Sequence, residues 1–162
     1  RIDLKKRFAK LNTNSKWLVS CSRLSYWKRI DRMINALKVC KADGVVCQLV
    51  VAGDGPEKEN LQKLTAEADV SELVVWLGAV AHDDIWALMN NADAFLITND
   101  VTNRCNPLYE AAWAGLPVVS VVDSSTADLL KHGENALLAN KDNVSAKGTV
   151  QNLLDLGGAD EG

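Results

Sequence analysis

The sequence is short of several features that mark common classes of protein. Its four cysteines (Cys21, Cys40, Cys47 and Cys105) include no pair with C-x-x-C spacing, which argues against a zinc site or a thioredoxin-like redox centre. No apolar run approaches the ~18 residues that a membrane-spanning helix needs, and no signal-peptide pattern is visible. The net charge of −3 gives no reason to expect nucleic acid as a partner. We therefore expect a cytoplasmic protein whose cysteines are reduced.

The chain of 162 residues, 48% of them hydrophobic, is long enough for one domain with a substantial core. Short apolar runs that predict strands alternate with stretches of helical periodicity. The predicted strands are 17–21, 45–52, 73–77, 94–97, 118–122 and 136–138. The predicted helices are 30–42, 57–68, 85–90 and 107–115, with a weaker one over 144–156. This alternation predicts an α/β fold: a doubly wound, mostly parallel, six-stranded, Rossmann-like sheet.

Polar and small residues that could serve a ligand fall directly after the predicted strands. Sheets of this kind bind ligands at the carboxyl ends of their strands. The candidates that this places on one rim are Arg23, Lys28, Gly53, Val80, His82 and the loop 99–110. Because they are far apart in the sequence, their convergence is stronger evidence than any single motif.

The most informative stretch is Asn99–Val122. A helix is predicted to begin at Pro107 and to end at Gly115, with Glu110 in its first turn. The N-terminus of a helix attracts phosphate, while a carboxylate at the same place can accept hydrogen bonds from sugar hydroxyls. A nucleotide, and especially a nucleotide-sugar, presents both groups.

Residues 106–119 resemble the nucleotide-sugar segment of family 4 retaining glycosyltransferases with the GT-B fold. That family has a pair of glutamates, of which Glu110 matches the second, whereas Thr102 stands at the position of the first. A second segment, Ser22-Arg23-Leu24 followed by Lys28-Arg29, is similar to the family's Gly-Arg-Leu and Lys-Gly. Both cations match, and both glycines are replaced.

The resemblance implies a role for each matching residue. Arg23 and Lys28 would be the catalytic residues, because they would hold the donor diphosphate and offset the charge of the leaving group. Glu110 would bind the ribose hydroxyls. The other donor-binding residues implied are Asn106, Leu108, Thr102, Asn103, Gly53, Val80 and His82. No metal is expected, because two cations and a helix terminus would carry the leaving diphosphate. No cofactor is expected, because the donor nucleotide-sugar is a substrate.

Structural alternatives stay open for several of these residues. Gly53 could serve only a tight turn into the next helix, rather than a close approach of the donor. His82 could be a solvated loop side chain or a partner at a helix start, and Asp83 could equally be the N-cap of helix 85–90. Glu110 could be an ordinary acid of a first helical turn.

The expected organisation is an extension or linker over 1–16, a donor-binding domain over 17–156 and a flexible tail over 157–162. Residues 1–16 are basic, so contact with a membrane surface is the alternative to a solvated linker. Arg1 does not look like a natural start, and the resemblance implies that the chain is one half of a GT-B architecture. The other half would be a separate N-terminal, acceptor-binding domain.

The predicted function is donor binding in a retaining, hexosyltransferase-type glycosyltransferase of polysaccharide or glycoconjugate synthesis. The chain alone is expected to be inactive, because the acceptor would bind the other domain. The alternatives are a non-catalytic nucleotide-binding α/β module and a degenerate transferase domain, both consistent with Thr102. A nucleotide-sugar epimerase lacks support, since no acid pair for proton abstraction is visible.

Overall fold

The computed structural model describes residues 15–44, 47–97, 115–116, 118–121 and 136–139. They form a Rossmann-like α/β fold around one sheet, in which every pair of neighbouring strands is parallel. The strands are β1 (Lys16–Cys21), β2 (Cys47–Ala52), β3 (Val74–Gly78), β4 (Ala94–Ile97), β5 (Val118–Val121) and β6 (Ala136–Ala139). The helices are η1 (Tyr26–Lys28), α2 (Ile30–Ala42), α3 (Lys58–Glu67), η2 (Ser71–Leu73) and α4 (His82–Asn91). The predicted α/β class and the parallel sheet are confirmed.

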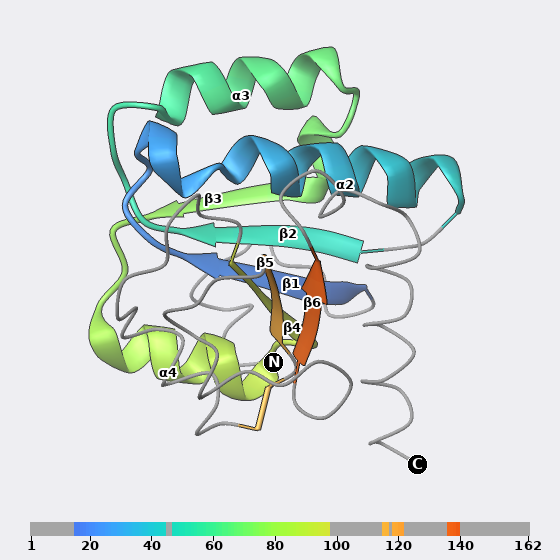
Figure 1. Cartoon of the computed structure of the whole chain (residues 1–162). Coiled ribbons are helices and arrows are strands. Elements are labelled where there is room, and N and C mark those ends of the chain that lie inside the picture. The colour runs from blue at the N-terminus through green and yellow to red at the C-terminus, as the bar shows by residue number, and fades with distance from the viewer. Residues whose placement is uncertain (1–14, 45–46, 98–114, 117, 122–135, 140–162) are drawn as a thin grey trace.

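Both faces of the sheet are buried, which explains why its strands read as nearly continuous apolar runs. All six residues of β2 are buried, and alternate side chains enter separate cores. Leu49 and Val51 pack with α2 and α3, whereas Val50 packs with Leu88 of α4 on the opposite side. Figure 1 shows α2 and α3 above the sheet and α4 below it, which is the doubly wound arrangement.

The strand order, β3-β2-β1-β4-β5-β6, determines where a ligand can bind. The chain moves outward from β1 through β2 to β3, then returns to pair β4 with the other side of β1. The strand order therefore reverses between β1 and β4, and ligands of such sheets typically bind at the carboxyl ends of the strands at such a point. Asp93 reinforces this pairing, since its carboxylate accepts a hydrogen bond from the Trp17 backbone N–H (2.7 Å).

The ends of several elements differ from the sequence-based expectation. Helix α4 begins at His82 instead of residue 85, and its N-cap is Ala81, so the prediction of Asp83 as the N-cap is wrong. Lys16, expected to belong to a linker, is the first residue of β1. Residues 107–114 of the predicted helix 107–115, the predicted helix 144–156 and the tail 157–162 lie outside the described residues.

Two cysteines behave as the small core residues that their surroundings predict. Cys40 of α2 and Cys47 of β2 are buried, free thiols in one core cluster. A hydrogen bond from the Cys47 thiol lowers the pKa of Cys40, and the same bond raises the pKa of Cys47. The third, Cys21, is only partly buried at the end of β1.

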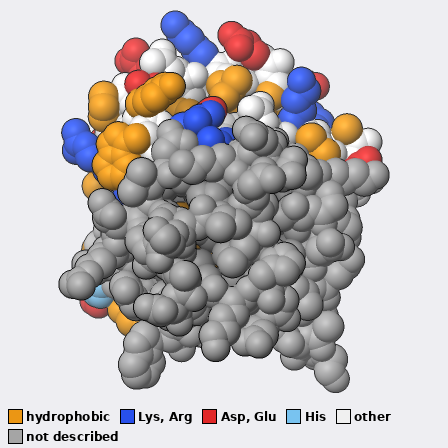
Figure 2. Space-filling model, viewed as in Figure 1, with side chains coloured by type: hydrophobic (Ala, Val, Ile, Leu, Met, Phe, Trp, Pro, Cys, Tyr) orange, Lys and Arg blue, Asp and Glu red, His pale blue; other side chains and the backbone are white. Residues whose placement is uncertain are grey.

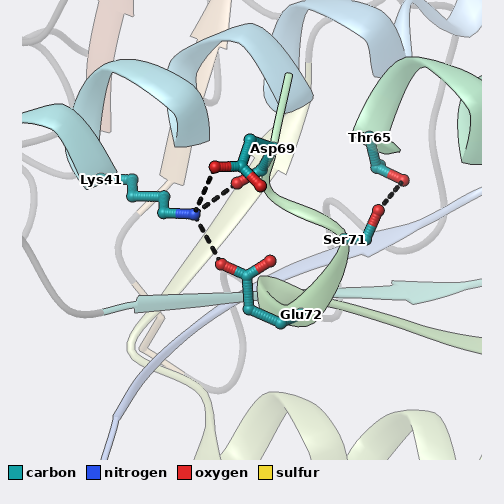
Figure 3. Close-up of polar contacts among 5 residues, drawn as sticks. All are labelled: Lys41, Thr65, Asp69, Ser71 and Glu72. Carbon is teal, nitrogen blue, oxygen red and sulfur yellow. Dashed lines mark hydrogen bonds and ion pairs between the residues drawn. The ribbon is translucent and has the colours of Figure 1, made fainter. Parts of the chain in front are cut away.

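A polar cluster at the amino-end side of the sheet joins α2 to the turn after α3 (Figure 3). The Lys41 ammonium donates to the Glu72 carboxylate (2.7 Å) and to the Asp69 carbonyl, and it lies 3.5 Å from the Asp69 carboxylate. Beside it the hydroxyls of Thr65 and Ser71 are 3.3 Å apart. These contacts fix the connection from α3 to β3.

The surface over α2 and α3 carries Lys and Arg side chains as well as Asp and Glu side chains (Figure 2). It therefore forms no continuous basic surface. Within the described ranges, no helix combines the length and apolar character needed to cross a membrane.

Candidate functional site

The loops after β1 and β2 are joined by backbone hydrogen bonds at the carboxyl edge of the sheet. Ser22 N–H donates to the Ala52 carbonyl (3.1 Å), and Leu24 N–H donates to the Asp54 carbonyl (3.0 Å). The Leu24 carbonyl in turn accepts from Glu57 N–H (3.0 Å). Arg23, between Ser22 and Leu24, is therefore held beside the turn that contains Gly53, as the sequence predicts.

The loop after β3 joins the same rim through one further bond. Gly53 N–H donates to the Gly78 carbonyl at 2.7 Å, at an isolated bridge just beyond β2 and β3. The chain then leads through Val80 to His82. The structure thus brings the candidates after three different strands to one edge.

Gly53 has a structural reason to be glycine that needs no ligand. Its φ is 137°, and a Cβ built on it would lie 1.8 Å from the Ser22 carbonyl oxygen. Two residues on, a Cβ on Gly55 would lie 2.5 Å from the Leu24 carbonyl oxygen. Both glycines allow the β1 loop to approach the β2 turn, so the tight-turn alternative accounts for them. Contact of Gly53 with a donor stays a prediction.

Arg23 is exposed at this rim. Its side chain has no hydrogen-bond or ion-pair partner within the described part of the chain. A guanidinium that no carboxylate neutralises keeps its full attraction for an anion, and its planar fork can grip a phosphate with two parallel hydrogen bonds.

Lys28 ends the short helix η1, five residues after Arg23 in the sequence. Its ammonium lies 4.3 Å from the centroid of the Trp27 ring. Tyr26 and Trp27 of the same helix are 74% and 51% exposed. Among the described residues, these two are the large hydrophobic side chains that face solvent. The rim therefore combines two cations with two solvent-facing rings.

Arg29 stands where the resembling family has the glycine of Lys-Gly, and it has the backbone conformation that favours glycine. Its φ is 55° and its ψ is 45°, the left-handed region. The guanidinium donates twice to Asp31, from Nε to Oδ1 (3.0 Å) and from a terminal nitrogen to Oδ2 (3.1 Å). Arg29 thus keeps the left-handed turn that glycine would allow, and its contact with Asp31 offsets part of the conformational cost.

Ser22 stands where the family has the first glycine. Its Oγ is buried and has no hydrogen-bond partner in the described part of the structure. A buried hydroxyl without a partner costs about 1–3 kcal/mol. Sequence reasoning had no signal for this, because the burial results from the neighbouring β2 turn.

The two candidates after β3 have structural partners. Val80 is half-buried and packs against the α4-side core. His82 is not a loop residue as expected, because it is the first residue of α4. Its Nε2 accepts a hydrogen bond from the Trp86 indole N–H at 3.2 Å, which bears out the alternative of a helix-start partner. Contact of Val80 or His82 with a base stays a prediction.

The predicted residues of the central stretch lie outside the described residues. They are Thr102, Asn103, Asn106, Leu108 and Glu110. What the structure does provide is the position from which that stretch departs, because β4 ends at Ile97 beside β1. In the described ranges, no group of three potential metal ligands occurs.

Several solved structures have the same fold. The Anabaena protein Alr3699/HepE, solved in complex with UDP, has a TM-score of 0.80 at 24% identity, covering 98% of this chain and 43% of that one. WaaG, a glycosyltransferase involved in lipopolysaccharide biosynthesis, has a TM-score of 0.77 at 18% identity, covering 96% and 42%. The chain therefore shares its Rossmann-like α/β fold with these structures.

The family follows from the sequence itself. The sequence profile described as "Glycosyl transferases group 1" matches residues 2–156. The chain therefore belongs to the glycosyl transferases group 1 family.

The curated relatives carry the names of glycosyltransferases. The chain is 31% identical over 98 residues to the 2-deoxystreptamine N-acetyl-D-glucosaminyltransferase of Niallia circulans, covering 60% of this chain and 25% of the relative. It is 27% identical over 149 residues to the amylovoran biosynthesis glycosyltransferase AmsK of Erwinia amylovora, covering 88% and 37%. A GDP-mannose-dependent phosphatidylinositol monomannoside mannosyltransferase of Mycobacterium tuberculosis is 28% identical over 165 residues, covering 96% and 42%. The chain thus spans between a quarter and about two fifths of the length of these relatives.

Proposed function

We propose that this chain is the donor-binding, C-terminal half of a family 4 retaining glycosyltransferase. In this proposal it binds a nucleoside-diphosphate sugar at the carboxyl edge of the sheet, between the loops after β1 and β4. The observation that carries the proposal is the position of Arg23, held by the Ser22 and Leu24 backbone bonds at the strand-order reversal.

The proposed chemistry uses charge at the leaving group. Arg23 and Lys28 hold the diphosphate and stabilise the negative charge that develops when the sugar–phosphate bond breaks. Glu110 accepts hydrogen bonds from the ribose hydroxyls, and backbone N–H groups near Asn106 and Leu108 cradle the phosphate and sugar. The sugar passes to an acceptor hydroxyl with its anomeric configuration retained. Two cations and a helix terminus replace a metal ion in this scheme.

The relatives narrow the donors worth testing. HepE was solved with UDP and with UDP-glucose, and the mycobacterial relative is GDP-mannose-dependent. Hexose donors on uridine or guanosine diphosphate are therefore the first candidates. The acceptor would lie on a second, N-terminal domain, so the chain alone would bind donor without transferring sugar.

A degenerate or non-catalytic nucleotide-binding domain is the second candidate, and Thr102 favours it. A threonine hydroxyl cannot replace the charge of the glutamate that the resembling family has there. Binding of nucleotide with no discrimination between UDP and UDP-glucose would support this candidate, because the sugar would then make no contact of its own.

Titration calorimetry with UDP, GDP, UDP-glucose and GDP-mannose tests the proposal. We expect one nucleoside diphosphate and its sugar derivative to bind. Arg23→Ala or Glu110→Ala should weaken this binding at least about tenfold, since each removes a charge-assisted contact. Lys38→Ala is the matched control, because Lys38 is exposed on α2, ten residues beyond Lys28. Absence of binding by the wild-type chain at millimolar nucleotide contradicts the proposal.

A further inference from the structure

We propose that Trp27 is a positioning residue that holds the Lys28 ammonium at the donor site. This role rests on the proposed function, because it assigns to Lys28 the task of meeting the diphosphate. The observation that carries it is the position of the Lys28 ammonium 4.3 Å from the Trp27 ring centroid.

The contact requires a specific arrangement of two neighbouring side chains. Consecutive residues of a helical turn project in different directions and do not normally face each other. The Lys28 side chain therefore folds back over the ring to bring its ammonium well within the ~6 Å that a cation–π interaction needs. Trp27 is 51% exposed, so burial in the core does not account for a tryptophan here.

The backbone around the pair is fixed on both sides. Ser25 N–H donates to the Arg23 carbonyl (2.9 Å), and Lys28 N–H donates to the Ser25 carbonyl (3.1 Å). After Lys28, Arg29 adopts the left-handed conformation and is clamped to Asp31. The long, rotatable side chain of Lys28 is the part that this backbone cannot restrict, and the ring limits its rotamers.

A ring can attract a cation without carrying a charge of its own. It acts through its quadrupole, so it adds no negative charge that would compete with a phosphate. The ring restricts the lysine side chain before the ligand arrives, so less side-chain entropy is lost on binding. Trp27 would therefore raise the affinity for a diphosphate without touching it.

Tyr26 provides a matched control. It is even more exposed than Trp27, but its side chain lines a cavity of about 400 Å³ against α3, together with Ile30, Leu61 and Leu64. A general effect of removing an exposed ring from η1 would appear in Tyr26→Leu as well as in Trp27→Leu.

The test measures UDP and GDP binding by the full chain and its variants. We expect Trp27→Leu to weaken binding about 2- to 5-fold, the range of an exposed cation–π contact, while Trp27→Phe keeps most of the affinity and Tyr26→Leu keeps all of it. In a Lys28→Met background, Trp27→Leu should cause no further loss. A merely structural tryptophan would lower affinity equally with and without Lys28, and that result overturns the proposal.

A second readout does not depend on nucleotide. The Trp27 ring current should shift the NMR signals of the Lys28 ε-methylene protons upfield, and Trp27→Leu should abolish the shift. No upfield shift in the wild type overturns the inference even if nucleotide binds. An upfield shift without nucleotide binding at millimolar concentration overturns the proposed function, and with it the role of Trp27 at the donor site. Unchanged affinity in Trp27→Leu overturns the role of Trp27 alone.

Discussion

Replacing Arg29 tests whether the turn at the donor rim is strained, as its φ of 55° indicates. A residue with a side chain pays about 1–2 kcal/mol in the left-handed region, whereas glycine does not. Glycine instead loses about 0.5–1 kcal/mol more backbone entropy on folding than alanine. The balance predicts that Arg29→Gly is about 0.5–1 kcal/mol more stable than Arg29→Ala.

The contact with Asp31 contributes to how both variants compare with the wild type. Its partners are 26% and 35% exposed, so the ion pair is worth about 0.2–1 kcal/mol after screening by solvent. Arg29→Ala loses the contact and keeps the strain, and it should therefore be less stable than the wild type by about that amount. Arg29→Gly loses the contact but also the strain, so it should lie within about 0.5 kcal/mol of the wild type.

Urea unfolding of the wild type, both Arg29 variants and Asp31→Asn measures these differences, provided that the urea dependence (m-value) is the same for all. Asp31→Asn removes the ion pair and leaves Arg29 in place. If alanine at this position proves more stable than glycine by 0.5 kcal/mol or more, as in an ordinary helix, the turn is not strained and the reasoning is wrong.

Three further predictions concern single positions. Gly53→Ala should lower the unfolding free energy by more than about 3 kcal/mol or prevent folding, because its Cβ would overlap the Ser22 carbonyl. Gly44→Ala is the control: its φ is 76° and no atom lies within 4 Å, so it should cost only about 1–2 kcal/mol. Chemical denaturation measures both variants, and equal costs would contradict the close approach. Ser22→Ala should raise the unfolding free energy by about 1 kcal/mol, since it removes a buried hydroxyl that has no hydrogen-bond partner among the described residues. A loss of stability would show that the hydroxyl does have a hydrogen-bond partner. The Lys41 contact lowers the pKa of Glu72, and hydrogen bonding to Glu72 raises the pKa of Lys41. The stability lost in Glu72→Gln should therefore be constant at neutral pH. It should shrink as pH falls below 4.5, the pKa of an isolated glutamate, and again as pH rises above 10.5, the pKa of an isolated lysine. A loss of stability that is independent of pH would exclude the ion pair.

The alternation of apolar runs and helical periods was sufficient to predict the fold, because both faces of a parallel sheet are covered and each strand is short. The start of α4 was not predictable in the same way. Asp83 could be a cap from its sequence context, but it occupies the first helical turn with Asp84. Their charges interact favourably with the helix dipole there, and Ala81 takes the extended conformation before the helix.

Local sequence also could not reveal contacts between segments that are distant along the chain. The sequence left open whether Gly53 meets a ligand or only forms a tight turn, because nothing in its own segment shows that the Ser22 carbonyl lies against it. The stacking of Lys28 on Trp27 follows no spacing rule, and it appears only when the side chains are placed. The role of Glu110 stays a prediction, resting on its place in the motif.

The most direct measurement is an NMR titration of the isotope-labelled chain with the nucleotide that binds best. If the loops after β1, β2 and β4 meet around one ligand, the amide signals of Arg23, Lys28, Gly53 and Glu110 will shift along a single saturation curve. Shifts confined to other surfaces, such as the cavity between η1 and α3, or separate curves for Arg23 and Glu110, would contradict a shared diphosphate-sugar site.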